Sequence, residues 1–252
     1  PQLVRSKWVN LNGVWDACVH DLDSEPNFSE TIIVPFPAGS DLSCFDHVLQ
    51  PDEILTVRRS FQNPISGTNE RLRVHFGAVD WSCKVFVNGI LVGTHAGGFN
   101  PFFFDITDAL ITSEEQEIIV SVTDPTDTGD QPVGKQTLNP FAIQYTAVAG
   151  IWQTVWLEPV PVSCIERATT TTNITESSIT VTCHVSNATD NMSVVFTCSA
   201  KGSVVAQTEL PIKQGQTKTV LNISDLRLWC PSDPFLYDLQ LQLIDSSGEV
   251  LD

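Results

Sequence analysis

The sequence has few basic side chains and a large excess of acidic ones. It contains 13 Lys and Arg residues against 30 Asp and Glu residues, and its formal net charge at pH 7 is −17. A surface of this sign repels the phosphates of nucleic acids and the headgroups of anionic lipids. We therefore expect no nucleic-acid partner and no attachment to an anionic membrane surface.

Long apolar runs are also missing. No stretch approaches the ~18 consecutive apolar residues that mark a membrane-spanning helix, so we expect no membrane span. The opening residues, PQLVRSKW, lack the apolar core of a signal peptide. The protein is then either not exported, or the sequence begins after a leader that has been removed.

Cysteines at metal-binding spacing are absent as well. None of the seven cysteines forms a C-x-x-C pair, and the acidic residues show no EF-hand-type spacing. We therefore expect no metal site and no cofactor. The odd number leaves at least one free thiol if the remaining cysteines form disulfides.

Five Asn-x-Ser/Thr sequons lie in polar, turn-like stretches and are predicted glycosylation sites. They begin at Asn27, Asn173, Asn187, Asn191 and Asn222. Sequons and cysteines together favour an extracellular or luminal protein of the secretory pathway that contains some disulfides. The alternative is a protein whose reduced thiols pack as small apolar side chains.

Short runs rich in Val, Ile, Thr and Phe recur along the chain, separated by Gly, Pro, Asn and Asp. Such runs are typical of strands. In VFVNGILVG, the pair Asn88-Gly89 predicts a β-hairpin, and LYDLQLQLID alternates like a strand with one solvated face. Only residues 105–110 (DITDAL) predict a short helical turn. We therefore predict an all-β protein.

A domain boundary is predicted near WLEPVPVS. Pro159 and Pro161 follow a strand and remove backbone donors, so the sheet must stop there. The sequence after Cys164 is rich in Thr and Ser, and short strands return at even spacing. We predict that residues 1–160 form a jelly-roll sandwich and residues 162–252 a smaller immunoglobulin-like β-sandwich.

The loop after the strand that ends at Thr123 is unusually long, about 25 residues without obvious regular structure. Carboxylates and amides bind hydroxyl groups, and aromatic rings cover C–H faces, so its composition favours a sugar site. The alternative is structural, because Asp-Pro and Asp-x-x-Gly sequences form turns. A hydrolytic carboxylate pair would need a desolvation that this acidic loop does not predict. The residues in question are Asp124, Asp127, Asp130, Lys135, Gln136, Tyr145 and Trp152.

Several longer strings resemble the N-terminal half of glycoside hydrolase family 2, which includes β-galactosidases, β-glucuronidases and β-mannosidases. They are PDEILTVRRSFQNP, RLRVHFGAVDWSCKVFVNGILVGTHAGGFNPFFFDITDAL, VTDPTDTGDQPVGKQ and YTAVAGIWQTVWLEPVP. In addition, WCPSDPFLYDLQLQL is similar to the end of the family's second, immunoglobulin-like domain. Together these matches span nearly the entire chain.

The resemblance implies a galactose-binding-like jelly-roll domain that binds sugar, followed by an immunoglobulin-like domain whose last strand is missing here. In the family, a (β/α)₈ barrel comes third and holds both catalytic glutamates. Because the sequence stops at Asp252, before such a barrel, we assign no catalytic residue and expect the chain as written to be inactive.

The resemblance also singles out sugar-binding residues. Some family members lend an aspartate to the sugar pocket at the end of a strand like IIVSVTD, and Asp124 matches that position. Lys135 and Gln136 lie in the loop that borders the same pocket in the family. Together with Tyr145, an aromatic residue of the same loop, these residues form the predicted sugar-binding set.

Two functions stay open at this point. In the first, the chain is the non-catalytic front of a secreted family 2 β-glycosidase-like protein and supplies carbohydrate recognition and scaffolding to a C-terminal catalytic barrel. In the second, it is a stand-alone glycan-binding or structural extracellular glycoprotein, assembled with a partner protein that completes the second sandwich. Both functions predict a carbohydrate partner.

Overall fold

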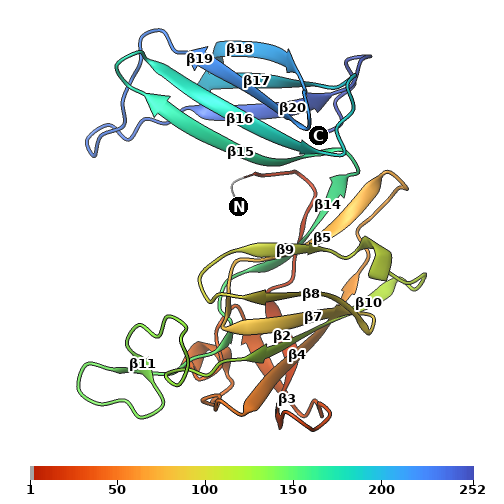
Figure 1. The fold of residues 1–252 in the computed structure, drawn as a ribbon, viewed down its shortest axis with the longest axis vertical. Helices are drawn as coiled ribbons and strands as arrows, with labels where there is room; N and C mark the ends of the chain where they lie inside the picture. Colours follow the sequence, from red (N-terminus) through yellow and green to blue (C-terminus); the bar gives the residue numbers. More distant parts are fainter. Residues whose placement is uncertain (1–2) are drawn as a thin grey trace. The chain divides into compact units, whose positions relative to one another are not determined.

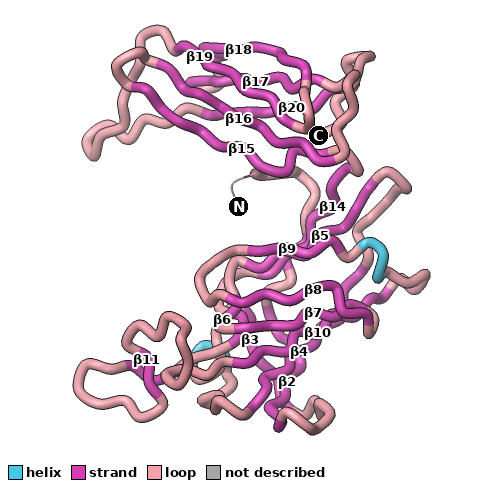
Figure 2. Tube along the Cα trace, viewed as in Figure 1, coloured by secondary structure: helices cyan, strands magenta, loops and turns pink. Residues whose placement is uncertain are grey.

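A computed structural model describes residues 3–252 and shows a chain built almost entirely of strands (Figure 1). The helical content of this part of the chain is confined to two single-turn 3-10 helices, η1 (Asp41–Ser43) and η2 (Thr107–Ala109) (Figure 2). No helix among these residues is long and apolar enough to cross a membrane. The prediction of an all-β protein is confirmed.

The chain divides into two compact units. The first unit is Arg5–Pro159, and the second consists of Val160–Asp252 together with the N-terminal segment that ends at Val4. The division falls inside the proline-containing strand β14 (Val155–Pro161). The predicted first domain starts at residue 1, and residues 1 and 2 lie outside the described part.

Two sheets form the sandwich of the first unit. The six-stranded sheet has the order β3-β2-β4-β10-β7-β8, and the four-stranded sheet has the order β1-β14-β5-β9. Two small two-stranded ladders, β11-β12 and β13-β6, join segments beyond the main sheets. The bounds are β1 (Val9–Asn10), β2 (Gly13–Asp21), β3 (Glu30–Val34), β4 (Glu53–Gln62), β5 (Glu70–Phe76), β6 (Val79–Asp80), β7 (Ser82–Val87), β8 (Ile90–Ala96), β9 (Phe102–Asp105), β10 (Glu115–Thr123), β11 (Gln136–Thr137), β12 (Tyr145–Thr146) and β13 (Gly150–Ile151).

Side-chain alternation explains why these runs form strands. In β10, every second residue from Gln116 to Val122 is buried, and the intervening ones are partly exposed. β10 lies between β4 and β7 and pairs antiparallel with both. Its buried apolar side chains belong to one core with Trp15 of β2 and Leu72 of β5, so the two sheets pack face to face.

Local turn chemistry is as the sequence predicts. Asn88 and Gly89 have φ angles of 50° and 79° and connect the antiparallel strands β7 and β8. Positive φ at both central residues matches a type I′ hairpin. The predicted helical turn is the 3-10 helix η2, and its first amide, that of Thr107, donates to the Asp105 carboxylate.

The second unit is a smaller sandwich of two three-stranded sheets, ordered β15-β16-β19 and β18-β17-β20. Its core includes Val181, Phe196 and Leu243, all fully buried. Residues 249–252 fold back along β20, where Ile244 and Val250 form a bridge. The bounds are β15 (Cys164–Asn173), β16 (Ser178–Ser186), β17 (Ser193–Ala200), β18 (Ser203–Pro211), β19 (Gln216–Asn222) and β20 (Asp238–Ile244).

The structure does not support the expected disulfides. No disulfide is recorded among the seven cysteines, each of which lies within residues 3–252. Most are buried; Cys83, Cys183 and Cys198 belong to the two apolar cores. Burial raises the pKa of the Cys83 and Cys183 thiols to about 12. These cysteines therefore pack as small apolar residues, which was the alternative interpretation of the sequence.

The absence of disulfides among the seven cysteines leads to a testable prediction. Without reductant, a thiol reagent such as dithionitrobenzoate should titrate seven groups in guanidinium chloride. In the native protein, exposed Cys44 and partly exposed Cys230 should react first, because the other five thiols are buried. A plateau at five or fewer groups in denaturant would reveal a disulfide and contradict the structure.

Candidate carbohydrate-binding site

Two acidic residues meet at one end of the six-stranded sheet. Thr123, the last residue of β10, is paired with Ser82, the first residue of β7. Asp124 follows Thr123 directly, and Asp80 precedes Ser82 by two positions. The register between β10 and β7 therefore brings the two carboxyl groups close together, although 44 positions separate them in the sequence.

Burial and mutual repulsion set the protonation of this pair. Desolvation, followed by the nearby charge of Asp124, raises the pKa of Asp80 to about 6, and a hydrogen bond from the Gln136 side chain opposes that rise. Asp124 is 5% exposed, and burial raises its pKa as well. The Thr126 amide donates to Asp124 Oδ1 at 2.8 Å and partly offsets the cost of burial.

Two neighbouring segments enclose Asp80. Gly150 of β13 is its cross-strand partner. On the other side lies the backbone of Gly98, where a side-chain Cβ would collide with the Asp80 carboxylate. The Trp152 indole N–H donates to the Gly98 carbonyl oxygen at 2.6 Å and ties these two segments together.

The structure places the predicted sugar-binding residues in two groups. Asp124 and Gln136 belong to one cluster, because each interacts with Asp80. The Gln136 carbonyl oxygen also accepts from the Val148 amide at 2.8 Å, which orients its amide nitrogen. We call Asp80, Asp124 and Gln136 the polar cluster.

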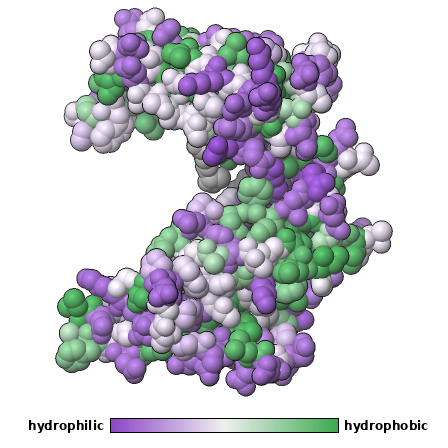
Figure 3. All heavy atoms as spheres, viewed as in Figure 1, coloured by the Kyte–Doolittle hydropathy of each residue, from purple (hydrophilic) through white to green (hydrophobic). Residues whose placement is uncertain are grey.

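Lys135 and Tyr145 form the second group. Both side chains are exposed on the projecting loop that carries the parallel strands β11 and β12 (Figure 1). The Lys135 ammonium lies 5.9 Å from the centre of the Tyr145 ring. At the far end of this loop, apolar side chains are open to solvent (Figure 3), including Phe141, which is 80% exposed.

The other two aspartates of the loop do not join the polar cluster. The Asp127 carboxylate accepts from the Thr137 hydroxyl at 2.5 Å and from the Leu138 amide at 3.2 Å, which lowers its pKa. Asp127 therefore links two parts of the same loop. Asp130 is fully on the surface.

Asp80 was not predicted as a site residue. The available signal was a single acidic residue in the otherwise apolar strand-like text GAVDW, where burial of the carboxyl group would need a purpose. Among the described residues, no group of three or more His, Cys, Asp or Glu side chains could hold a metal ion. The polar cluster instead offers carboxylate acceptors and an amide, which suit hydroxyl groups.

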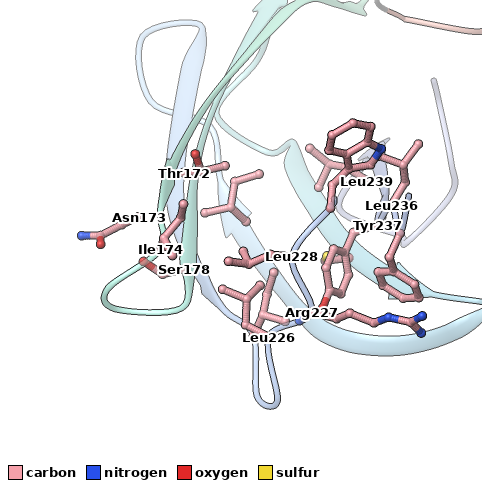
Figure 4. A pocket seen from close by; sticks show the side chains of 15 residues that line it. Thr172, Asn173, Ile174, Ser178, Leu226, Arg227, Leu228, Leu236, Tyr237 and Leu239 are labelled. Atoms are coloured by element: carbon pink, nitrogen blue, oxygen red, sulfur yellow. The ribbon is translucent and has the colours of Figure 1, made fainter. Parts of the chain in front are cut away.

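A hollow of about 440 Å³ lies within the second unit (Figure 4). Its wall is mostly apolar and includes Leu226, Leu228 and Leu236. The Arg227 guanidinium at this hollow is paired with Asp233 at 2.5 and 2.6 Å, so its charge is already neutralised. Sugar hydroxyls buried here would lose hydrogen bonds to water. We therefore place the candidate carbohydrate site in the first unit.

Comparison with protein families agrees with both units. Residues 50–161 match the family described as "Glycosyl hydrolases family 2, sugar binding domain", and residues 164–252 match the one described as "Glycosyl hydrolases family 2". The chain belongs to glycosyl hydrolase family 2. The family 2 sugar-binding match includes all three residues of the polar cluster.

Curated relatives are longer than this family 2 chain. A β-galactosidase of Thermoanaerobacter pseudethanolicus is 26% identical over 97% of the chain, which covers 34% of that protein. A β-glucuronidase of Paenibacillus borealis is 26% identical over 88% of the chain, which covers 39% of that protein. The chain thus spans less than half the length of these relatives, and residues 3–252 contain no (β/α)₈ barrel.

Solved structures share the fold over the whole chain. The β-glucuronidase of Ruminococcus gnavus, in complex with D-glucaro 1,5-lactone, matches with a TM-score of 0.77 at 19% identity, covering 100% of this chain and 45% of that one. The β-glucuronidase of Bifidobacterium dentium matches with a TM-score of 0.76 at 22% identity, covering 98% of this chain and 47% of that one.

The raised pKa of Asp80 gives a pH-dependent prediction. An acid whose pKa is about 6 when folded and about 3.9 when unfolded disfavours folding above pH 6, and this penalty fades as the pH falls toward 4. Asp80→Asn removes the penalty and should keep the hydrogen bond from Gln136. Its melting temperature should exceed that of the wild type by a few degrees at pH 7.5, and by much less at pH 4.5.

Asp130→Asn is the matched control, because it removes the same charge from an exposed position on the loop that follows β10. Its melting temperature should follow that of the wild type at both pH values. An equal gain for Asp80→Asn at pH 4.5 and pH 7.5 would contradict a desolvated, raised-pKa carboxyl group.

Proposed function

We propose that the first unit binds a sugar residue through the polar cluster, and that the chain is the recognition and scaffolding part of a family 2 β-glycosidase. The observation that carries this proposal is the pair of adjacent, desolvated carboxyl groups of half-buried Asp80 and buried Asp124, backed by the Gln136 amide. Groups of this kind are seldom left desolvated without a ligand to bind, and perturbed acids concentrate at functional sites.

The energetics support a requirement for the whole cluster. One charge-assisted hydrogen bond contributes roughly 1.5–3 kcal/mol, and even millimolar affinity needs about 4 kcal/mol. Asp124 alone is therefore insufficient. Two carboxyl groups and an amide that act on adjacent hydroxyls reach that range, and their desolvation strengthens each bond.

We infer β-galactosides or β-glucuronides as the ligand class. The relatives that match over most of this chain are β-galactosidases and β-glucuronidases. Because the chain spans less than half of their length, the activity of the whole protein is part of this proposal as well.

We assign recognition, not bond cleavage, to the polar cluster. Glycosidases place their two carboxyl groups on either side of the scissile bond. Asp124 instead follows β10 and Asp80 precedes β7 at the same end of the six-stranded sheet, so both approach a ligand from the same side.

One observation favours an extracellular or luminal location, and with it the alternative of a glycan-binding glycoprotein. The side chains of all five sequon asparagines are exposed: Asn27, Asn173, Asn187, Asn191 and Asn222. An oligosaccharide on any of them would extend into solvent. Asn187 would have to release its hydrogen bond to the Val162 carbonyl oxygen.

Binding tests the proposed function. NMR titration of the chain with methyl β-D-galactopyranoside and methyl β-D-glucuronide should show millimolar binding of at least one of them. Asp124→Asn keeps the side-chain shape and should weaken that binding about tenfold or more, because it removes a charged acceptor. Asp130→Asn should bind like the wild type. Equal affinities of all three proteins would refute the assignment.

Glycosylation tests the location. The chain, expressed behind a secretory leader in a eukaryotic host, should leave the cell with added mass that peptide N-glycosidase F removes. Asn187 should be the least occupied sequon, because its amide nitrogen is already engaged. Secretion with no change in mass would count against all five sites.

A further inference from the structure

An exposed aromatic residue follows the backbone segment that contacts the polar cluster. Phe99 is 60% exposed, yet it follows Gly98, whose backbone lies against the Asp80 carboxylate. A large apolar side chain in solvent contributes nothing to the core of the first unit, and Phe99 does not belong to that core. Its position is nevertheless closely controlled by its neighbours.

The Trp152 ring packs against the Phe99 ring. The two rings meet edge to face, with centroids 5.9 Å apart and an interplanar angle of 74°. The Trp152 indole is itself fixed by its bond to the Gly98 carbonyl oxygen. Upstream, the Gly97 amide donates to the Trp81 carbonyl oxygen at 3.1 Å, so both residues that precede Phe99 are anchored.

We propose that Phe99, supported by Trp152, is the aromatic wall of the sugar site and stacks on the C–H face of the pyranose whose hydroxyls bind Asp80 and Asp124. This inference rests on the proposed function. A pyranose combines a rim of hydroxyls with an apolar face of C–H groups. Carboxylates beside an exposed ring match that combination.

The stacking ring is Phe99 and not Tyr145. One side of the Tyr145 ring is occupied by the Lys135 ammonium. Tyr145 also lies on the projecting loop, where its strand β12 pairs with β11. Phe99 follows Gly98, whose backbone lies directly against the Asp80 carboxylate, whereas Tyr145 adjoins the polar cluster through its pairing with Gln136.

The ligand class follows from the wall. An aromatic ring favours pyranoses with an uninterrupted patch of C–H groups on one face, as in the galactose configuration, where O4 is axial. In the glucose configuration, equatorial hydroxyls leave a smaller patch. We therefore expect methyl β-D-galactopyranoside to bind more tightly than methyl β-D-glucopyranoside.

Saturation-transfer NMR and affinity titration of the full chain test the wall. Saturating aromatic protons should mark H3, H4 and H5 of methyl β-D-galactopyranoside most strongly. Phe99→Ala should weaken its binding about two- to tenfold, the range of aromatic contacts, and should lose that pattern. Phe99→Trp should retain both. Phe99 is mostly exposed, so the variants should fold, and melting temperatures check this.

Phe141→Ala is the matched control, because it truncates another exposed phenylalanine of the first unit. It should bind like the wild type. If Phe99→Ala also binds like the wild type while Asp124→Asn does not, the wall is refuted and the polar cluster stands. If the wild type binds none of the methyl glycosides, the polar cluster and the wall are refuted together.

Discussion

The site depends on one constraint, which is that the fold holds two desolvated carboxyl groups close together. Asp80 and Asp124 repel each other, and each would be better solvated apart. Thr123 of β10 is paired with Ser82 of β7, and both are inner strands of the six-stranded sheet. This pairing prevents the two carboxyl groups from moving apart. This arrangement lowers the stability of the fold, and the packing of the sandwich core compensates for the loss, as is common where a fold carries a functional site.

Several features of the first unit make sense as consequences of that constraint. Glycine at residue 98 leaves the Asp80 carboxylate in place, because a side chain there would displace it. The Gln136 amide, oriented by the Val148 amide, gives Asp80 one favourable partner. The Thr126 amide does the same for Asp124. Both donors lie on the long loop after β10, so their hydrogen bonds to Asp80 and Asp124 also hold this loop in place.

The sequence predicts those parts of the molecule that local rules determine. The strands follow from alternation, the β7–β8 hairpin from Asn88-Gly89, and the position of Asp124 from the end of its strand. Asp80 could not be predicted in this way, because its surroundings depend on a pairing with Gly150, 70 positions away. The cysteines were misjudged for a related reason: their number says nothing about which of them lie in a core.

The bonding capacity of the polar cluster bears on how such a chain would act. Asp124 already accepts one hydrogen bond from Thr126, and Asp80 accepts one from Gln136. Each carboxylate keeps further lone pairs for a ligand, but the Gln136 side-chain oxygen is occupied by the Val148 amide, so the site offers few groups in all. Such a site can orient a sugar but holds it weakly, unless other contacts add to it. This favours a recognition unit that works together with a second set of sugar contacts over a lectin that works alone.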